Sequence, residues 1–186
     1  MGKTLLRFQN PKTKIILFEA EMPVIVEDTR NQLGKHKEEN AYFEEHGFRV
    51  VRSKMLVGDY MIANKGDIVI DTKKDILELF MDLGKDHKRF RRECELARAS
   101  GIQLIVLTEE LPPEKGLSDW KSPVFRSSNS IHQAGDPKSK ANPQTMLKIM
   151  QTMQEKYGVV FIFCRKQDAG ERIIYFLTGG SYIDIS

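Results

Sequence analysis

The chain has 186 residues and a mass of 21.4 kDa, and 40% of its residues are hydrophobic, so it can bury the core of one ordinary domain. Its 29 lysines and arginines against 26 aspartates and glutamates leave a net charge of only +3, which excludes a uniformly basic protein that wraps nucleic acid. Any positive surface must be local. The apolar runs are far shorter than the roughly 20 residues of a membrane helix, so we expect a soluble protein with no membrane partner.

Residues 1–10 hold no apolar stretch of the kind that a signal peptide needs, so no export signal is expected. Cys94 and Cys164 lie far apart in the sequence and suggest neither a disulfide framework nor a zinc site. A reducing cytoplasm is therefore the expected compartment.

Short β-rich runs alternate with helical stretches along the chain, which predicts a mixed α/β domain. The predicted strands are Lys14 to Phe18, Val24 to Val26, Phe48 to Leu56, Tyr60 to Ala63, Asp67 to Thr72, Ile102 to Leu107 and Val159 to Cys164. The predicted helices are Lys37 to His46, Asp75 to Leu83, Lys88 to Ser100, Pro143 to Tyr157 and Asp168 to Leu177. The run Ile102 to Leu107 is fully apolar, which suits the centre of a sheet that is covered on both faces.

Between Glu109 and Asn142 this pattern stops, and four prolines interrupt a stretch rich in serine, asparagine, glycine and lysine. Loops of this length inside a compact domain are usually functional or mobile. We therefore predict a single domain over residues 1–186 that contains a long loop or insertion at about 109–142.

The segment with the most chemical information is Gly58-Asp59-Tyr60, which is followed by a strand ending in Asp71-Thr72-Lys73. Residues two apart in a strand share a face, so Asp71 and Lys73 project together, and a hairpin can bring Asp59 beside them. Two carboxylates on one patch favour a cation between them, and oxygen ligands suit Mg²⁺ or Mn²⁺. A neighbouring lysine can steady a hydroxide nucleophile or the charge that develops on a phosphate. This is the arrangement of metal-dependent nucleases, although an Asp-x-Lys strand also occurs by chance in many α/β proteins.

A second pair of acids, Glu27 and Asp28, ends the apolar strand that precedes Arg30. Sites in α/β folds tend to lie at strand ends, so these carboxylates are candidates for the same site. The alternative is that a strand-end acid only caps a turn.

All of the net positive charge lies between Lys85 and Arg98, where six basic residues and three acids give a local +3. Cations on one rigid helix are suited to the phosphates of a nucleic acid. The alternative is a solvated helix face with internal pairs such as Arg89 with Glu93.

Three other features are less specific. The four histidines, His36, His46, His87 and His132, have no metal-binding spacing, and we expect ordinary surface residues. Trp120 either stacks on a base or anchors the long loop. The methionines of the helix that follows the loop are expected in the core.

Taken in this order, the residues resemble the nuclease domain of the XPF-type structure-selective endonucleases, in the restriction-endonuclease-like superfamily. The segment Val24-Ile25-Val26-Glu27-Asp28-Thr29-Arg30-Asn31 resembles the family's strand with Asp-x-Arg-Glu, and Gly58-Asp59-Tyr60 resembles its Gly-Asp-Tyr motif. Asp71-Thr72-Lys73 stands where the family has Glu-Arg-Lys. Arg89-Phe90-Arg91-Arg92 is similar to the Arg-Phe helix of the bacterial and phage members. The likeness covers residues 23–110.

The sequence departs from that pattern at several positions. Asn31 replaces the glutamate of the first motif, Asp71 a glutamate and Thr72 an arginine, and Leu77 stands where another acid is expected. Loss of the charge at Asn31 suggests catalysis with one metal or an altered preference among ions. Within residues 1–186 we expect no helix-hairpin-helix module of the kind that follows the nuclease part in the family's eukaryotic members.

The resemblance implies a restriction-endonuclease-like three-layer fold, with a central mixed β-sheet flanked by helices, and a DNA endonuclease that uses Mg²⁺ or Mn²⁺. The resemblance implies metal binding by Asp28, Asp59 and Asp71, and Glu27 could extend this coordination. Lys73 would activate or position the attacking water. Contacts with DNA would come from Arg30, Arg89, Arg91 and Arg92. Flapped, branched or junction DNA is the expected substrate, and the lysine-rich loop would close over that DNA. The expected role is in DNA repair, recombination or phage DNA processing within a bacterial or phage-infected cell. A homodimer or a complex with a nuclease partner subunit is the expected assembly. Two alternatives stay open: a nucleic-acid-binding domain that kept the fold and lost catalysis, and a non-catalytic subunit that pairs with a nuclease partner through its C-terminal helices.

Overall fold

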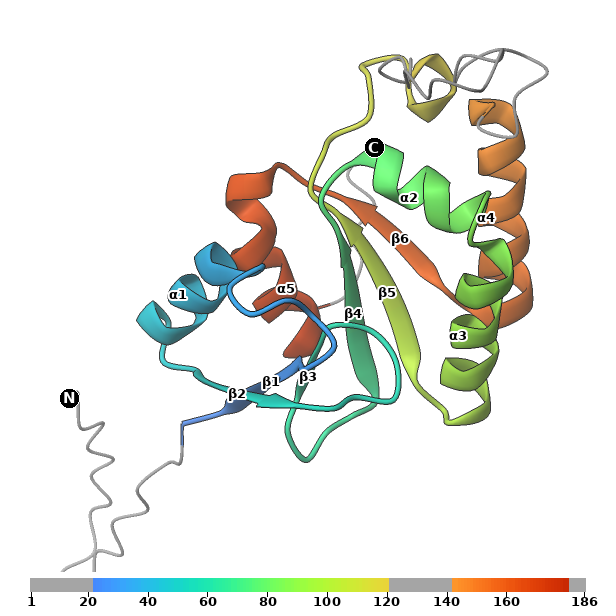
Figure 1. Ribbon diagram of the computed structural model, residues 1–186. Coiled ribbons are helices and arrows are strands. Elements are labelled where there is room, and N and C mark those ends of the chain that lie inside the picture. Colours follow the sequence, from blue (N-terminus) through green and yellow to red (C-terminus); the bar gives the residue numbers. More distant parts are fainter. Residues whose placement is uncertain (1–21, 121–141, 181–186) are drawn as a thin grey trace, which may run out of the picture.

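Six strands form one mixed sheet in the order β2-β1-β3-β4-β5-β6 (Figure 1). A computed structural model describes residues 22–120 and 142–180 of the chain. The strands are β1 (Val24–Asp28), β2 (Arg49–Ser53), β3 (Tyr60–Ile62), β4 (Ile68–Lys73), β5 (Gln103–Thr108) and β6 (Val160–Phe163). The predicted strand Lys14 to Phe18 lies outside the described residues.

The directions of the strands decide where their ends meet. β2 runs parallel to β1, and β5 and β6 run parallel to β4. β3 lies between these two groups and is antiparallel to both β1 and β4. All strands except β3 therefore end at the same edge of the sheet, and β3 begins there.

Helices cover both faces of the sheet (Figure 1). One face carries α2 (Ile76–Leu83), α3 (His87–Ala99) and α4 (Pro143–Tyr157), and the other carries α1 (Lys37–Glu45) and α5 (Ala169–Leu177). Two short 3₁₀ turns, η1 (Leu117–Asp119) and η2 (Lys166–Asp168), precede α4 and α5. The expected three-layer fold of the restriction-endonuclease-like kind is thereby confirmed.

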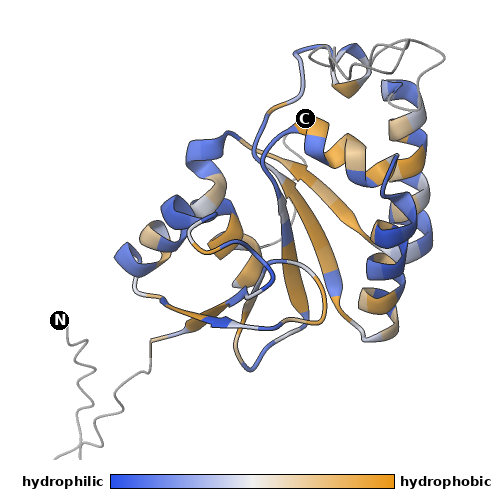
Figure 2. Cartoon of the chain, viewed as in Figure 1, coloured by the Kyte–Doolittle hydropathy of each residue, from blue (hydrophilic) through white to orange (hydrophobic). Residues whose placement is uncertain are grey.

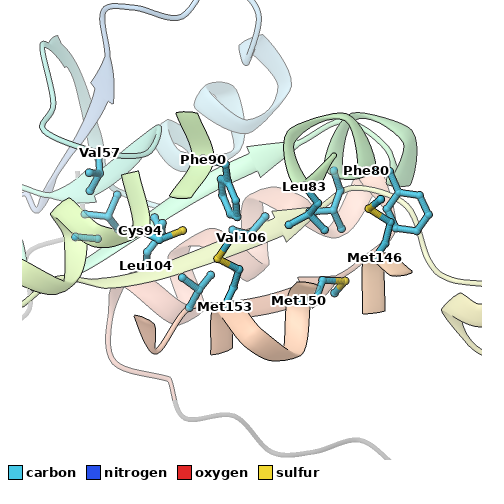
Figure 3. Packing of buried hydrophobic residues seen from close by; sticks show 14 of the residues in the cluster. Val57, Phe80, Leu83, Phe90, Cys94, Leu104, Val106, Met146, Met150 and Met153 are labelled. Atoms are coloured by element: carbon cyan, nitrogen blue, oxygen red, sulfur yellow. The ribbon is translucent and has the colours of Figure 1, made fainter. Parts of the chain in front are cut away.

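Each face of the sheet has its own hydrophobic core, because alternate residues of a strand point in opposite directions. Val69 of β4 packs toward α2, α3 and α4, whereas Ile70 packs toward α1 and α5. Figure 3 shows the first of these cores, in which Met146, Met150 and Met153 of α4 lie against the side chains of α2 and α3. Figure 2 shows the same division along the chain, with apolar strands between helices that are polar on their outer sides.

The structure settles the role of Trp120, which the sequence left open. The part of the long loop that is described contains η1, and Trp120 beyond it is buried against Phe80 with ring centroids 4.8 Å apart. Trp120 is thus a loop anchor and not a stacking platform for a base. The rest of the predicted loop, residues 121–141, lies outside the described residues, as does His132.

The expectation that His36 is a surface residue is wrong. Its side chain is 3% exposed and lies edge-on to the Tyr60 ring, with centroids 5.4 Å apart. His36 immediately precedes α1 and packs on Tyr60 of β3, and no local sequence pattern indicates this contact between two elements.

Both cysteines are free and buried, in agreement with the absence of a disulfide framework. Within residues 22–120 and 142–180, no helix combines the length and apolar character needed to span a bilayer.

Candidate active site at the carboxyl edge of the sheet

The polar residues singled out in the sequence gather where the parallel strands end. Asp28 ends β1 and Lys73 ends β4, while Asp59 immediately precedes β3. Asp59 lies against β4, because Tyr60 pairs with Ile70 and the Asp59 amide donates a 2.7 Å hydrogen bond to the Ile70 carbonyl oxygen. The hairpin thus brings Asp59 to the end of β4, close enough for its charge to act on Asp71 and for the charge of Lys73 to act on it. Metal binding by Asp59 and Asp71 together stays a prediction.

Gly58 allows the chain to approach β4 closely enough for this arrangement. Its φ is +64°, a left-handed conformation that favours glycine. A Cβ at this position would lie 2.9 Å from the carbonyl oxygen of Ile70 and 2.4 Å from a methyl of Val69. The Gly58 amide donates a 2.8 Å hydrogen bond to Glu93 of α3, so the loop is tied to both the strand and the helix.

The Asp59 carboxylate is held by three hydrogen bonds. Its Oδ2 accepts from the amide of Thr72 at 2.8 Å and from the Thr72 hydroxyl at 2.6 Å, and its Oδ1 accepts from the Asn31 side chain at 2.9 Å. Burial by itself raises the pKa of Asp59, but these hydrogen bonds outweigh burial and hold the pKa below its ordinary value. Asp59 is therefore an anion at neutral pH.

Lys73 lies between two buried carboxylates on the face of the sheet that α2 covers. Its Nζ is 2.7 Å from Asp71 Oδ2 and 2.8 Å from Asp82 Oδ2 of α2. Burial lowers the pKa of Lys73, but the charges of Asp71 and Asp82 raise it well above its ordinary value. The ammonium group therefore stays protonated at neutral pH, so Lys73 can position water or balance charge but cannot accept a proton.

Asp71 is the carboxylate with the least support from hydrogen bonds. Its Oδ2 is buried and lies 2.7 Å from the Lys73 ammonium, with no other side-chain partner among the described residues. Burial, joined by the charges of Asp59 and Glu93, raises the pKa of Asp71 above its ordinary value against the opposing effect of Lys73. An additional cation at this position would be stabilised by Asp71 and Asp59 together.

The donor chemistry of this pair fits Mg²⁺ or Mn²⁺. Within the described ranges, no three acidic, histidine or cysteine side chains converge in a way that holds a metal ion. Mg²⁺ does not need such a cage, because it is commonly bound through one or two carboxylates, with water and substrate phosphates as its other ligands. Asp59 and the incompletely satisfied Asp71 are the residues that would provide those carboxylates.

The other two acids predicted for the site have different partners. The Asp28 carboxylate contacts the Arg30 guanidinium and accepts from the amides of Arg30 and Met55, at 3.1 and 3.4 Å. Glu27 points to the opposite face, where its Oε2 accepts from Asn40 at 3.0 Å and lies 3.4 Å from Arg52. Metal binding by Asp28, with or without Glu27, stays a prediction.

The four predicted DNA-binding arginines divide into two places. Arg30 follows β1, with its side chain 52% exposed despite its contact with Asp28. Arg89, Arg91 and Arg92 lie on α3, where Arg89 pairs with Asp82 and Arg91 with Glu95. The alternative of a solvated helix face included an ion pair of Arg89 with Glu93 in the same helix. Arg89 pairs instead with Asp82 of α2.

Sequence reasoning missed the partners that hold the predicted residues in place. Asp82 is an acid among the buried apolar residues of α2, a local signal that could have marked it as functional. Asn31 and Thr72 were recognised only as departures from a motif, yet both donate to Asp59. Glu93 belongs to the basic helix, and no local pattern indicates that it reaches the Gly58 loop.

Comparison with known protein families identifies the family to which the chain belongs. Residues 27–177 match the model of the ERCC4 domain, a range that contains every residue described for the site. The chain belongs to the ERCC4 domain family. No curated protein matches this ERCC4 domain. Its place in the bacterial or phage branch of the family stays a prediction.

Solved structures share the fold of this ERCC4 domain. XPF from Aeropyrum pernix has a TM-score of 0.56 and 14% sequence identity, and the match covers 83% of this chain and 63% of that one. XPF from Aeropyrum pernix in complex with DNA has a TM-score of 0.53 and 15% identity, with 88% of this chain and 68% of that one covered. This chain therefore spans less than two thirds of the first structure, and at these identities the likeness establishes the fold.

Proposed function

We propose that this ERCC4 domain is an endonuclease that hydrolyses DNA phosphodiester bonds with Mg²⁺ or Mn²⁺. The observation that carries the proposal is the pair of carboxylates, Asp59 and Asp71, at the sheet edge with the charged Lys73 held 2.7 Å from Asp71. Membership of a nuclease family and the fold shared with XPF, one structure of which is a DNA complex, support DNA as the substrate.

Each side chain has a role that follows from its surroundings. A divalent cation held by Asp59 and Asp71 would polarise the scissile phosphate and lower the pKa of a bound water. Lys73 stays protonated, so its task is to orient the attacking water and to offset the negative charge that develops on the phosphate. Asp82 holds Lys73 from the opposite side and fixes the direction of its ammonium group.

Phosphodiester hydrolysis places the oxygen of water on phosphorus, breaks one P–O ester bond, and leaves a hydroxyl on one strand end and a phosphate on the other. Arg30 and the arginines of α3 would contact the strand on either side of that bond through its phosphates. We further propose a branched substrate such as a flap or junction, a role in DNA repair, recombination or phage DNA processing, and a cytoplasmic location. Residues 1–186 would form one nuclease-like domain, acting alone, as a homodimer or with a nuclease partner.

One observation favours a second candidate, a DNA-binding domain without catalysis. Both Asp28 and Asp59 already accept hydrogen bonds from protein groups, so a metal at either carboxylate competes with those donors. The same reasoning extends to a non-catalytic subunit of a nuclease complex.

The test is cleavage of labelled single-stranded, duplex, flapped and four-way-junction DNA in Mg²⁺, Mn²⁺ or EDTA. Asp71→Asn and Lys73→Met should abolish cleavage, and Lys148→Met, at an exposed lysine of α4, should leave it unchanged. DNA that is bound but never cut by the unaltered protein would instead support the binding domain. Cleavage that persists in EDTA or in Asp71→Asn would overturn the proposed site.

A further inference from the structure

Four charged side chains connect the surface of α3 with the proposed metal site. Arg89 of α3 pairs with Asp82 Oδ1 of α2, Asp82 Oδ2 lies 2.8 Å from Lys73 Nζ, and Lys73 Nζ lies 2.7 Å from Asp71 Oδ2. The side chain of Arg89 is 65% exposed, whereas those of the other three residues are each 8% exposed. This ion-pair network therefore begins at the solvent and ends at a buried carboxylate of the site.

The two inner members of the ion-pair network each have two partners. The Lys73 ammonium is shared between Asp71 and Asp82, and the Asp82 carboxylate is shared between Lys73 and Arg89. Charges interact strongly where burial lowers the local dielectric constant, so an ion that engages one partner changes the balance for the next. A change at one end of the network thus acts on the other end.

Both ends of the network have capacity for a further ion. An arginine carries several N–H donors, and the pair of Arg89 with Asp82 uses only Nη2. At the other end, Asp71 Oδ2 has no side-chain partner besides Lys73 in the described part of the chain, and the charge of Asp59 also acts on Asp71. The exposed end suits an anion such as a DNA phosphate, and the buried end suits a cation.

The alternating signs of the four charges set the direction of the effect. A phosphate at Arg89 competes with Asp82 for the guanidinium group, so Asp82 then acts mainly on Lys73. Lys73 in turn offsets less of the charge of Asp71, which favours a cation there. A cation at Asp71 has the reverse effect, because it repels Lys73 toward Asp82 and so leaves Arg89 available to a phosphate. Each ion should therefore favour the binding of the other.

We propose that the ion-pair network couples DNA binding on α3 to metal binding at Asp71 and Asp59. The inference rests on the proposed function, because it takes DNA and the metal as the two ligands. Asp82 is a positioning residue in this account, since it would contact neither ligand. Buried ion pairs often stabilise a fold no more than apolar side chains do, and the coupling gives these buried charges a role beyond stability.

The experiment measures the affinity for a labelled flapped duplex by fluorescence anisotropy, in EDTA and in Ca²⁺ at constant ionic strength. Ca²⁺ supplies the charge of the metal, and a gel run in parallel checks that the DNA is intact. The coupling factor is the affinity in Ca²⁺ divided by the affinity in EDTA. Asp71→Asn gives its baseline, because this variant lacks one of the two proposed metal ligands.

We expect a coupling factor about tenfold above the baseline for the unaltered protein, as is usual for linked sites. Arg89→Ala should bring the factor close to the baseline, and its fold should be retained because Arg89 is mostly exposed. Arg92→Ala is the matched control, since Arg92 is an exposed arginine of the same helix outside the network. This control should weaken DNA binding in EDTA but keep the coupling factor.

Asp82→Asn tests the middle of the network. It should remove the coupling without weakening DNA binding in EDTA, because Asp82 is buried and would not contact DNA. Calorimetry of Ca²⁺ binding with and without the flapped duplex should give the same coupling factor for the unaltered protein, since linkage is reciprocal. A coupling factor that is unchanged in Arg89→Ala, or one that is already at the Asp71→Asn baseline in the unaltered protein, would overturn the inference.

Cleavage in Mg²⁺ or Mn²⁺ separates this inference from the proposed function. Coupling that depends on Arg89 while no DNA is cut would support the network and refute the nuclease. Cleavage that needs metal and Asp71, without any coupling, would refute the network and leave the nuclease in place.

Discussion

Thr72 and Thr108 are buried threonines at the ends of neighbouring strands, and their hydroxyl groups differ in one respect. The Thr72 hydroxyl donates to Asp59 at 2.6 Å, whereas the Thr108 hydroxyl has no hydrogen-bond partner in the described part of the chain. Valine has almost the same shape as threonine but lacks the hydroxyl. Thr72→Val therefore removes the bond to Asp59, and Thr108→Val is its matched control.

A hydrogen bond to a charged group contributes about 1.5–3 kcal/mol. Asp59 would keep its bonds from the Thr72 amide and the Asn31 side chain, so only one of three bonds is lost. We expect Thr72→Val to lower the free energy of unfolding by about 1.5–3 kcal/mol near pH 7. Thr108→Val should leave it unchanged or raise it, because the buried hydroxyl that it removes is unpaired.

The cost of Thr72→Val should also depend on pH. The hydrogen bonds hold the folded-state pKa of Asp59 below its unfolded value of about 3.9. Their stabilisation is therefore fully present above that value and is lost as the pH falls through the lower folded-state pKa. The difference between the unaltered chain and Thr72→Val should shrink from pH 7 to about pH 3.

Urea unfolding followed by tryptophan fluorescence can measure both effects, since Trp120 is the single tryptophan and is buried against Phe80. Equal destabilisation by the two valine variants, or a cost of Thr72→Val that is the same at both pH values, would refute the role of Thr72 as a partner of the Asp59 carboxylate.

Three further predictions concern the surroundings of the site. Gly58→Ala should lower the free energy of unfolding, measured by thermal unfolding, by about 1–3 kcal/mol more than Gly101→Ala does. Both glycines have positive φ, but only a Cβ at position 58 would meet the backbone of β4. Similar losses in the two variants would contradict the close approach of Gly58 to β4. Asp82→Asn should lower the pKa of Lys73 and reduce the free energy of unfolding by about 1.5–3 kcal/mol, whereas unchanged stability would show that Asp82 does not hold Lys73. Arg92→Ala should leave stability unchanged and reduce the slope of log affinity against log salt for DNA by about 0.9; an unchanged slope would remove Arg92 from the DNA interface.

Two of the departures from the family's motifs contact the same carboxylate in the structure, that of Asp59. Asn31 stands where the resemblance places a glutamate and Thr72 where it places an arginine, and both side chains donate to the Asp59 carboxylate. In the sequence the lost charge at Asn31 suggested catalysis with one metal or an altered preference among ions. In the structure they form a clamp that keeps Asp59 charged and fixed beside Asp71.

The sequence by itself determined the elements and the face on which each strand residue lies. The helix Pro143–Tyr157 follows its predicted bounds, because the Asn142 side chain caps it by accepting a hydrogen bond from the Gln144 amide and Gly158 ends it in a left-handed conformation. Asp71 and Lys73 share a face because a strand repeats every two residues. Such features depend only on neighbours in the chain, so periodicity, caps and turn residues suffice to predict them.

Only the tertiary structure decided which groups meet. Residues from different elements come together in the ion pair of Asp82 with Lys73 and in the hydrogen bond from Asn31 to Asp59. The burial of His36 likewise depends on another element, because its ring packs on Tyr60. Those contacts depend on the order of the strands and on which helix covers which face, and side chains far apart in the sequence carry no local signal of their partners. The raised pKa of Lys73 follows from that packing, because the charges of Asp71 and Asp82 outweigh the effect of burial.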